Sequence, residues 1–125
     1  MPILQMRPTE QVCVDQERLS ALYAQLGDAG AEDVVCRAME ELALRLSHCN
    51  RLFQDRNWID LRKNSRSLVP ISDQVGLERL AAVAGDVVRC IDQRDEVALS
   101  ATLTRLIRIG ERSLTAIWDT QDLSL

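Results

Sequence analysis

The sequence predicts an all-α protein: an antiparallel up-down four-helix bundle with an additional short N-terminal helix. Apolar residues recur at alternating steps of three and four in four long segments, which places them on one face of a helix packed lengthwise on its neighbours. Aromatic residues make up only 3% of the chain, whereas sheet proteins are rich in aromatic and β-branched residues. We expect a single domain over residues 1–125, with its core at about 15–118.

The first expected helix runs from about Val12 or Asp15 to Leu26, with Gly27 as its C-terminal stop, because glycine commonly terminates helices. A turn follows, and the second helix is expected over about 31–55. Its apolar positions alternate steps of four and three, and they are Val35, Met39, Leu42, Leu46, Cys49 and Phe53.

The third expected helix begins at Asn57, with Asp60 three residues later in a capping-box-like start. Its inner face is expected to consist of Trp58, Leu61, Ser65 and Leu68. Pro70 has no N–H for the carbonyl of Arg66, and its ring crowds that carbonyl. We therefore expect this helix to end or kink near Leu68.

Ser72 is the expected cap of the fourth helix. The inner face of that helix is expected to consist of Leu77, Leu80, Val83, Ala84, Val87 and Ile91. Asp95 is the expected cap of the fifth helix, which should end near Trp118, and residues 119–124 should fray. The inner face of the fifth helix is expected to consist of Leu99, Leu103, Leu106, Gly110, Leu114 and Ile117.

Charge and hydropathy exclude several classes of partner. The formal net charge is −4, whereas binding to nucleic acid or to an anionic membrane surface needs positive charge. No apolar run approaches the length that spans a bilayer. Residues 1–8 are too short and too broken by proline to form a secretory signal. A cytoplasmic location is expected.

The cysteines are expected to be buried as small apolar side chains. They are far apart in the chain, without a Cys-x-x-Cys pair and with a single histidine, so no metal site and no cofactor is expected. Cys36, Cys49 and Cys90 fall inside apolar helical stripes, which favours burial. Two disulfides, with Cys13 included, are the alternative.

The residues around Arg66 have a recognisable spacing. Leu68 stands two residues after Arg66, Gly76 ten and Leu80 fourteen, and Trp58 precedes Arg66 by eight. This frame resembles the motif of the histidine-containing phosphotransfer (HPt) domains of bacterial phosphorelays. That motif reads His-x-Leu-Lys-Gly, with a glycine ten residues after the histidine and an apolar residue four further on. The resemblance extends over roughly residues 15–118.

Three motif positions differ from the family: the histidine is replaced by Arg66, the lysine by Val69 and the glycine by Pro70. A guanidinium cannot accept and release a phosphoryl group as a neutral imidazole can, so we expect no phosphotransfer, no catalytic residue and no enzyme. The resemblance implies a signalling role through contact with a histidine kinase or with a receiver domain, whose acidic pocket binds a divalent cation. The expected partner-binding residues are Arg62, Lys63, Arg66, Val69 and Pro70.

Arg66 could enter such an acidic pocket and form bidentate bonds to carboxylates. A plain solvated helix face is the alternative for this basic patch. In the family, the motif lysine helps to hold the phosphoryl group, and Val69 cannot do so. The motif glycine lets the partner approach closely, and Pro70 adds bulk at that position.

Two further functions are alternatives. The first is a structural or oligomeric helical adaptor, such as a homodimer, that self-associates through exposed apolar residues. The candidate residues for that contact are Val34, Leu44, Val88 and Ile109. The second is a phosphotransferase that uses His48, the only histidine, which lies outside the motif frame and beside the core positions of the second helix.

Overall fold

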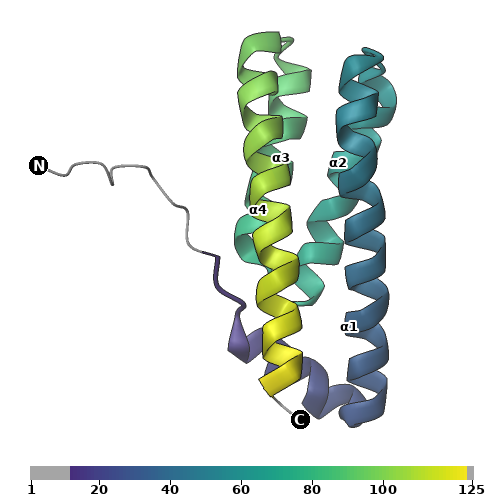
Figure 1. Cartoon of the computed structure of the whole chain (residues 1–125), viewed down its shortest axis with the longest axis vertical. Helices are drawn as coiled ribbons and strands as arrows, with labels where there is room; N and C mark the ends of the chain where they lie inside the picture. The colour runs from purple at the N-terminus through teal and green to yellow at the C-terminus, as the bar shows by residue number, and fades with distance from the viewer. Residues whose placement is uncertain (1–11, 124–125) are drawn as a thin grey trace, which may run out of the picture.

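The computed structural model describes residues 12–123, which are all-helical apart from short connections (Figure 1). The helices are α1 (Gln16–Gln54), α2 (Trp58–Gln74), α3 (Glu78–Asp92) and α4 (Glu96–Leu123). Each helix contacts the next one in the chain, and α4 also contacts α1, so the four helices close into a ring around one core. The predicted all-α class is confirmed. Within the described residues, no helix is both long enough and apolar enough to cross a membrane.

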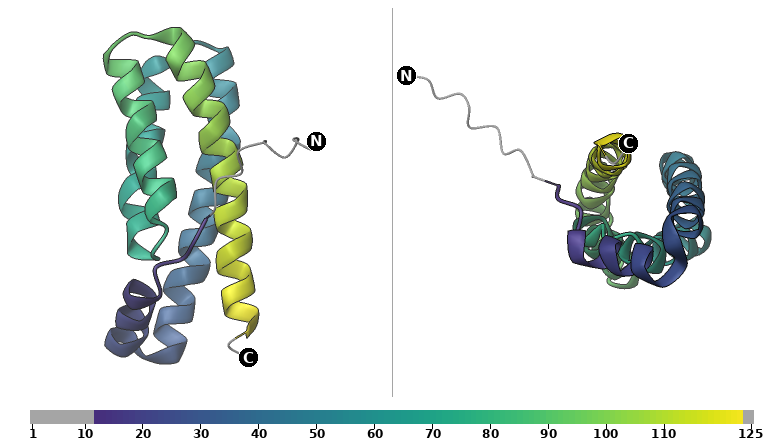
Figure 2. Two further views of the ribbon diagram at one scale, coloured as in Figure 1. Left: turned by 90° about the vertical axis from the view of Figure 1, so that its left-hand side faces the viewer. Right: turned by 90° about the horizontal axis from the view of Figure 1, so that it is seen from below.

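α1 contains the first two predicted helices and changes direction at Gly27. The backbone there has φ 78° and ψ 168°, a conformation open to glycine but not to residues with a Cβ. Figure 2 shows the part of α1 before Gly27 crossing one end of the bundle. The N–H of Asp15 donates a 2.8 Å hydrogen bond to the carbonyl of Gly76, which ties the start of α1 to the turn between α2 and α3.

The core is built from the predicted inner faces. Most of their residues are buried, and the buried ones are Val35, Leu42, Leu46, Cys49, Leu61, Ser65, Leu68, Leu77, Leu80, Val83, Ala84, Val87, Leu99, Leu103, Leu106, Gly110 and Ile117. The remaining ones are half-buried against the same core, and they are Met39, Phe53, Trp58, Ile91 and Leu114. Removal of this apolar surface from water is the main force that holds the four helices together.

The predicted end of the third helix near Leu68 is wrong. α2 continues through Pro70 to Gln74. Arg66 and Pro70 are both exposed, so water can bond the carbonyl that the proline leaves without a helical partner. The buried side chains of Ser72 and Val75 keep the next turn packed on the core.

Ser72 is therefore not a helix cap, because it lies inside α2. The chain turns instead at Gly76, which has φ +80°, and a Cβ there would lie 2.8 Å from the carbonyl oxygen of Asp15. The two other predicted caps are confirmed. The Asn57 carboxamide accepts a 3.1 Å hydrogen bond from the N–H of Asp60, and Asp95 accepts a 3.0 Å bond from the N–H of Ala98.

The predicted fraying after Trp118 is also wrong for the residues that the structure describes. α4 continues to Leu123, and residue 124 lies outside the described range. Ile117 is completely buried, and the hydroxyl of Thr120 donates a 2.9 Å hydrogen bond to the carbonyl of Ala116. The buried side chain of Ile117 therefore anchors the end of α4 on the core.

All four cysteines are free thiols. Cys49 is buried and Cys90 is half-buried, but Cys13 and Cys36 are exposed. The expected burial is thus wrong for Cys36, which follows the buried Val35 in the helix and is rotated out of the core. Burial raises the pKa of the Cys49 thiol to about 11, and a hydrogen bond from Asn64 opposes this shift.

Candidate protein-binding site on α2

The five residues predicted to bind a partner lie on the outer side of α2. Leu61, Asn64, Ser65 and Leu68 are buried and form the core side of α2, and the five residues lie at positions on the other side of the helix. Lys63, Arg66 and Pro70 are exposed, and Arg62 and Val69 are half-buried. Since α2 is continuous, the five residues share one helical surface, which we call the α2 face.

Arg62 forms an ion pair with Asp92 of the same chain. Its Nε donates a 2.7 Å hydrogen bond to Oδ1 of Asp92, and its Nη2 donates a 3.1 Å bond to Oδ2 of the same carboxylate. This bidentate pair joins α2 to the last residue of α3. Half of the Asp92 side chain and 38% of the Arg62 side chain remain exposed, so solvent screens the pair. The expectation that Arg62 offers its charge to a partner together with Arg66 is therefore weakened.

The charges near Arg66 influence each other. The hydrogen bonds from Arg62 lower the pKa of Asp92 below its ordinary value, partial desolvation opposes this shift, and the positive charge of Arg66 lowers it further. The same hydrogen bonds raise the pKa of Arg62. Arg66 thus lies close enough to act on Asp92 through space, and its exposed guanidinium can meet an approaching carboxylate.

A buried polar network holds α2 against α1 beneath the α2 face. Nδ2 of Asn64 donates a 2.7 Å hydrogen bond to the carbonyl of Arg45 and a 3.3 Å bond to Sγ of Cys49. The Cys49 thiol donates a 3.3 Å bond to the same carbonyl, and the Arg45 side chain pairs with Glu41 at 2.8 Å. Asn64 precedes Arg66 by two residues, so this network fixes the rotation of α2 about its axis where Arg66 emerges.

Sequence reasoning missed Asn64 and Arg45. A polar residue at a buried position is the signal that could have drawn attention to Asn64. Its partners lie on a different helix and 15 to 19 residues away in the chain, so helical periodicity alone does not pair them.

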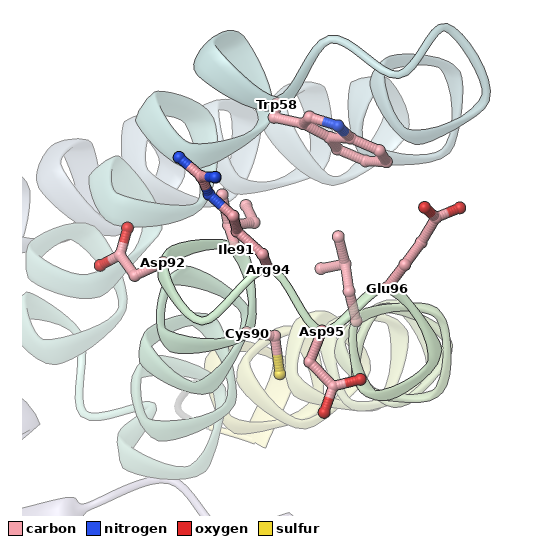
Figure 3. A pocket seen from close by; sticks show the side chains of 8 residues that line it. Trp58, Cys90, Ile91, Asp92, Arg94, Asp95 and Glu96 are labelled. Carbon is pink, nitrogen blue, oxygen red and sulfur yellow. The ribbon is translucent and has the colours of Figure 1, made fainter.

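A cavity of about 550 Å³ lies beside the Arg62–Asp92 pair, at the turn between α3 and α4. Figure 3 shows the indole of Trp58 across from this turn, with the Glu96 side chain extending toward the Trp58 side and the Asp95 carboxylate pointing away from it. The remaining lining residues are Cys90, Ile91, Asp92, Arg94 and Leu99. The acidic groups have structural partners: Asp95 caps α4, and Glu96 pairs with Arg56 at 3.0 Å. Among residues 12–123, no cluster of three or more His, Cys, Asp and Glu side chains could hold a metal ion.

The residues of the alternative functions are scattered. His48 is exposed on α1, a different helix from Arg66. Of the apolar residues expected to mediate self-association, Leu44 is 54% exposed, but Ile109 is completely buried. Val34 and Val88 are half-buried. The expectation of an exposed Ile109 is wrong, because its position on α4 lies on the core side, next to Gly110.

No protein-family model matches this chain, and no curated protein and no solved structure matches it. The resemblance to HPt domains therefore rests on the spacing of residues around Arg66.

Proposed function

We propose that this chain is a non-catalytic, HPt-like signalling protein that binds a receiver domain or a histidine kinase of a two-component system. The observation that carries the proposal is the exposed guanidinium of Arg66 on a fixed helix face, at the position where the resembling family has its phosphoacceptor histidine. The proposal implies a bacterial, cytoplasmic protein of one domain.

The proposal also implies the architecture of HPt domains, an antiparallel up-down bundle with a short N-terminal helix across one end. Connections of three residues between successive helices support this arrangement, since they leave no room for a crossover. The break at Gly27 supports a separate N-terminal helix.

The chemistry of Arg66 supports binding without catalysis. A guanidinium stays protonated, presents its donors in a planar fork and pairs bidentately with carboxylates. The resemblance implies that a receiver offers a pocket of aspartates at the position facing Arg66. An arginine in that pocket stands where the phosphoryl group and the divalent cation otherwise bind, so the chain would occupy the receiver and keep it from a phosphate donor.

A binding assay with purified receiver domains tests the proposal. We expect one or more receivers to bind in the unphosphorylated state, and we expect excess Mg²⁺ to weaken the complex, because the cation and Arg66 compete for the same carboxylates. Incubation with the phosphorylated receiver should leave no acid-labile phosphate on the chain. Phosphohistidine at His48, or a complex that Mg²⁺ does not affect, would contradict this function. A dimer that binds no receiver would favour the oligomeric adaptor.

A further inference from the structure

A second candidate surface lies between α1 and α4. A cavity of about 410 Å³ is lined by α1 residues Cys36, Met39, Glu40 and Ala43 and by α4 residues Leu114 and Trp118. Trp118 is 59% exposed, although tryptophan is among the largest apolar side chains. We call this surface the α1–α4 groove.

α1 and α4 come close together beside the groove at Gly110, where a Cβ would lie 2.5 Å from Cδ1 of Leu46. α1 and α4 are also the two longest helices. Viewed from below in Figure 2, they form the arms of a U whose closed side is made by the start of α1 together with α2 and α3. The open side has no helix of this chain over it among the described residues.

The exposed apolar residues of the groove favour a protein partner. A tryptophan beside half-buried Met39 and Leu114 can be fully desolvated by an inserted side chain, and such sites carry most of the free energy of binding in protein interfaces. The lining residues of α1 span about two helical turns, which is the length of contact that one helix makes when it lies in a groove.

The charge around the groove indicates the chemistry of that partner. Glu40 lines the groove, and Glu32 and Glu111 are exposed one turn before Cys36 and Leu114 on the two helices. The whole chain carries a net charge of −4. We propose that the α1–α4 groove binds an amphipathic helix of another protein, with an apolar stripe that covers Trp118 and with basic residues that flank the stripe.

This inference goes beyond the function proposed for the α2 face, because it uses other residues and the opposite kind of charge. Arg66 would meet an acidic pocket, whereas the groove would meet a basic helix. The two surfaces lie on different helices, and α2 does not contact α4. One molecule could therefore hold two partners at once.

The test uses a designed helical peptide of about 18 residues, with a leucine stripe at i, i+3, i+4 and i+7 and with lysine flanks. A matched peptide keeps the leucine stripe and has glutamate flanks. Fluorescence anisotropy measures the affinity of each for the full chain. Alkylation of Cys36, followed by mass spectrometry, reports on the groove, and exposed Cys13 outside it is the internal reference. We expect the lysine peptide to bind at least about ten-fold more tightly than the glutamate peptide. It should slow alkylation of Cys36 and leave Cys13 unchanged.

Two variants separate the groove from general attraction to an acidic protein. Trp118→Ala should reduce the affinity for the lysine peptide by about ten-fold or more. Glu40→Lys should reduce the preference for lysine flanks over glutamate flanks. Arg66→Ala should leave the affinity for both peptides unchanged. Equal binding of both peptides, or binding that Trp118→Ala leaves unchanged, would overturn the proposal. A dimer in sedimentation analysis that Trp118→Ala dissociates would also overturn it, because the occupant would then be a second copy of this chain.

Discussion

Arg62 and Arg66 stand one helical turn apart on α2 but have different roles. Arg62 forms two hydrogen bonds to Asp92 and so connects α2 to α3. Arg66 is exposed, and its positive charge lowers the pKa of Asp92 without a hydrogen bond between the two side chains. A substitution of Arg62 therefore tests the contact between α2 and α3, whereas a substitution of Arg66 tests partner binding at the α2 face.

Asp92→Asn should lower the free energy of unfolding at pH 7 and have little effect in acid. The pKa of Asp92 in the folded protein is lowered from its ordinary value of 3.8. The ionised carboxylate therefore contributes stability above that value, and the contribution is lost as the pH falls through the lower folded pKa. Urea unfolding of both proteins at pH 7 and at a pH below the lowered pKa of the folded protein measures the difference. Asp119→Asn, at an exposed position, is the control. A loss of stability of the same size at both pH values would show that the Arg62–Asp92 pair is not its cause.

Pro70 illustrates how α2 tolerates a residue that is unfavourable inside a helix. Its neighbour one turn earlier is the exposed Arg66, and Leu68 and Ser72 on either side of Pro70 are buried. The missing hydrogen bond lies on the solvent side, while the contacts that hold the helix lie on the core side. Helix continuity is decided here by packing and not by local propensity.

Pro70→Ala should raise the free energy of unfolding by about 1–3 kcal/mol. Alanine restores the N–H for the carbonyl of Arg66 and relieves the crowding of the ring. Alanine also makes the unfolded chain more flexible than proline does, which reduces this gain in stability by about 0.4–1 kcal/mol. Chemical denaturation measures the change, with exposed Lys63→Ala as the control. A lower stability than wild type would mean that the proline ring packs favourably in the folded protein.

Two glycines inside helices should respond to alanine in opposite directions. Gly110→Ala should destabilise the protein by about 1–3 kcal/mol, because the new Cβ would meet Cδ1 of Leu46 at 2.5 Å where α1 and α4 are close. Gly85→Ala in α3 should stabilise it by about 0.5–1 kcal/mol, because no atom lies within 4 Å of the new Cβ and alanine is a better helix former. Thermal and denaturant unfolding of both variants measure the two effects. Equal effects of the two substitutions would show that the contact at Gly110 is relaxed.

At the scale of the whole molecule, the sequence predicts the local elements much better than the contacts between them. The period of the apolar residues identifies most of the buried apolar positions of the four helices, with Ile109 as an exception, since it depends only on neighbours along the chain. Asn57 and Asp95 are identified as caps for the same reason. The bonds of Asn64 to Arg45, the Arg62–Asp92 pair and the α1–α4 groove depend on which helices lie side by side. No periodicity within one segment contains that information.

The two proposed surfaces would together let the molecule connect two proteins of opposite charge. The Asn64 network fixes the rotation of α2, and the missing side chain of Gly110 lets α1 and α4 come close together beside the groove. Arg66 on one face and Trp118 on the other are then presented by parts of the same core.

The affinity of Arg66→Ala for the receiver that binds the wild-type chain tests the central claim most directly. We expect a loss of about 2–5 kcal/mol, mainly through faster dissociation, because the substitution leaves buried carboxylates of the receiver without a partner. Lys63→Ala should have a smaller effect that disappears at high salt, as is typical of charges at the rim of an interface. Arg66→His should not restore phosphotransfer, because Val69 and Pro70 still replace the motif lysine and glycine. Equal affinities of wild type and Arg66→Ala would contradict the claim and reduce Arg66 to a solvated surface charge.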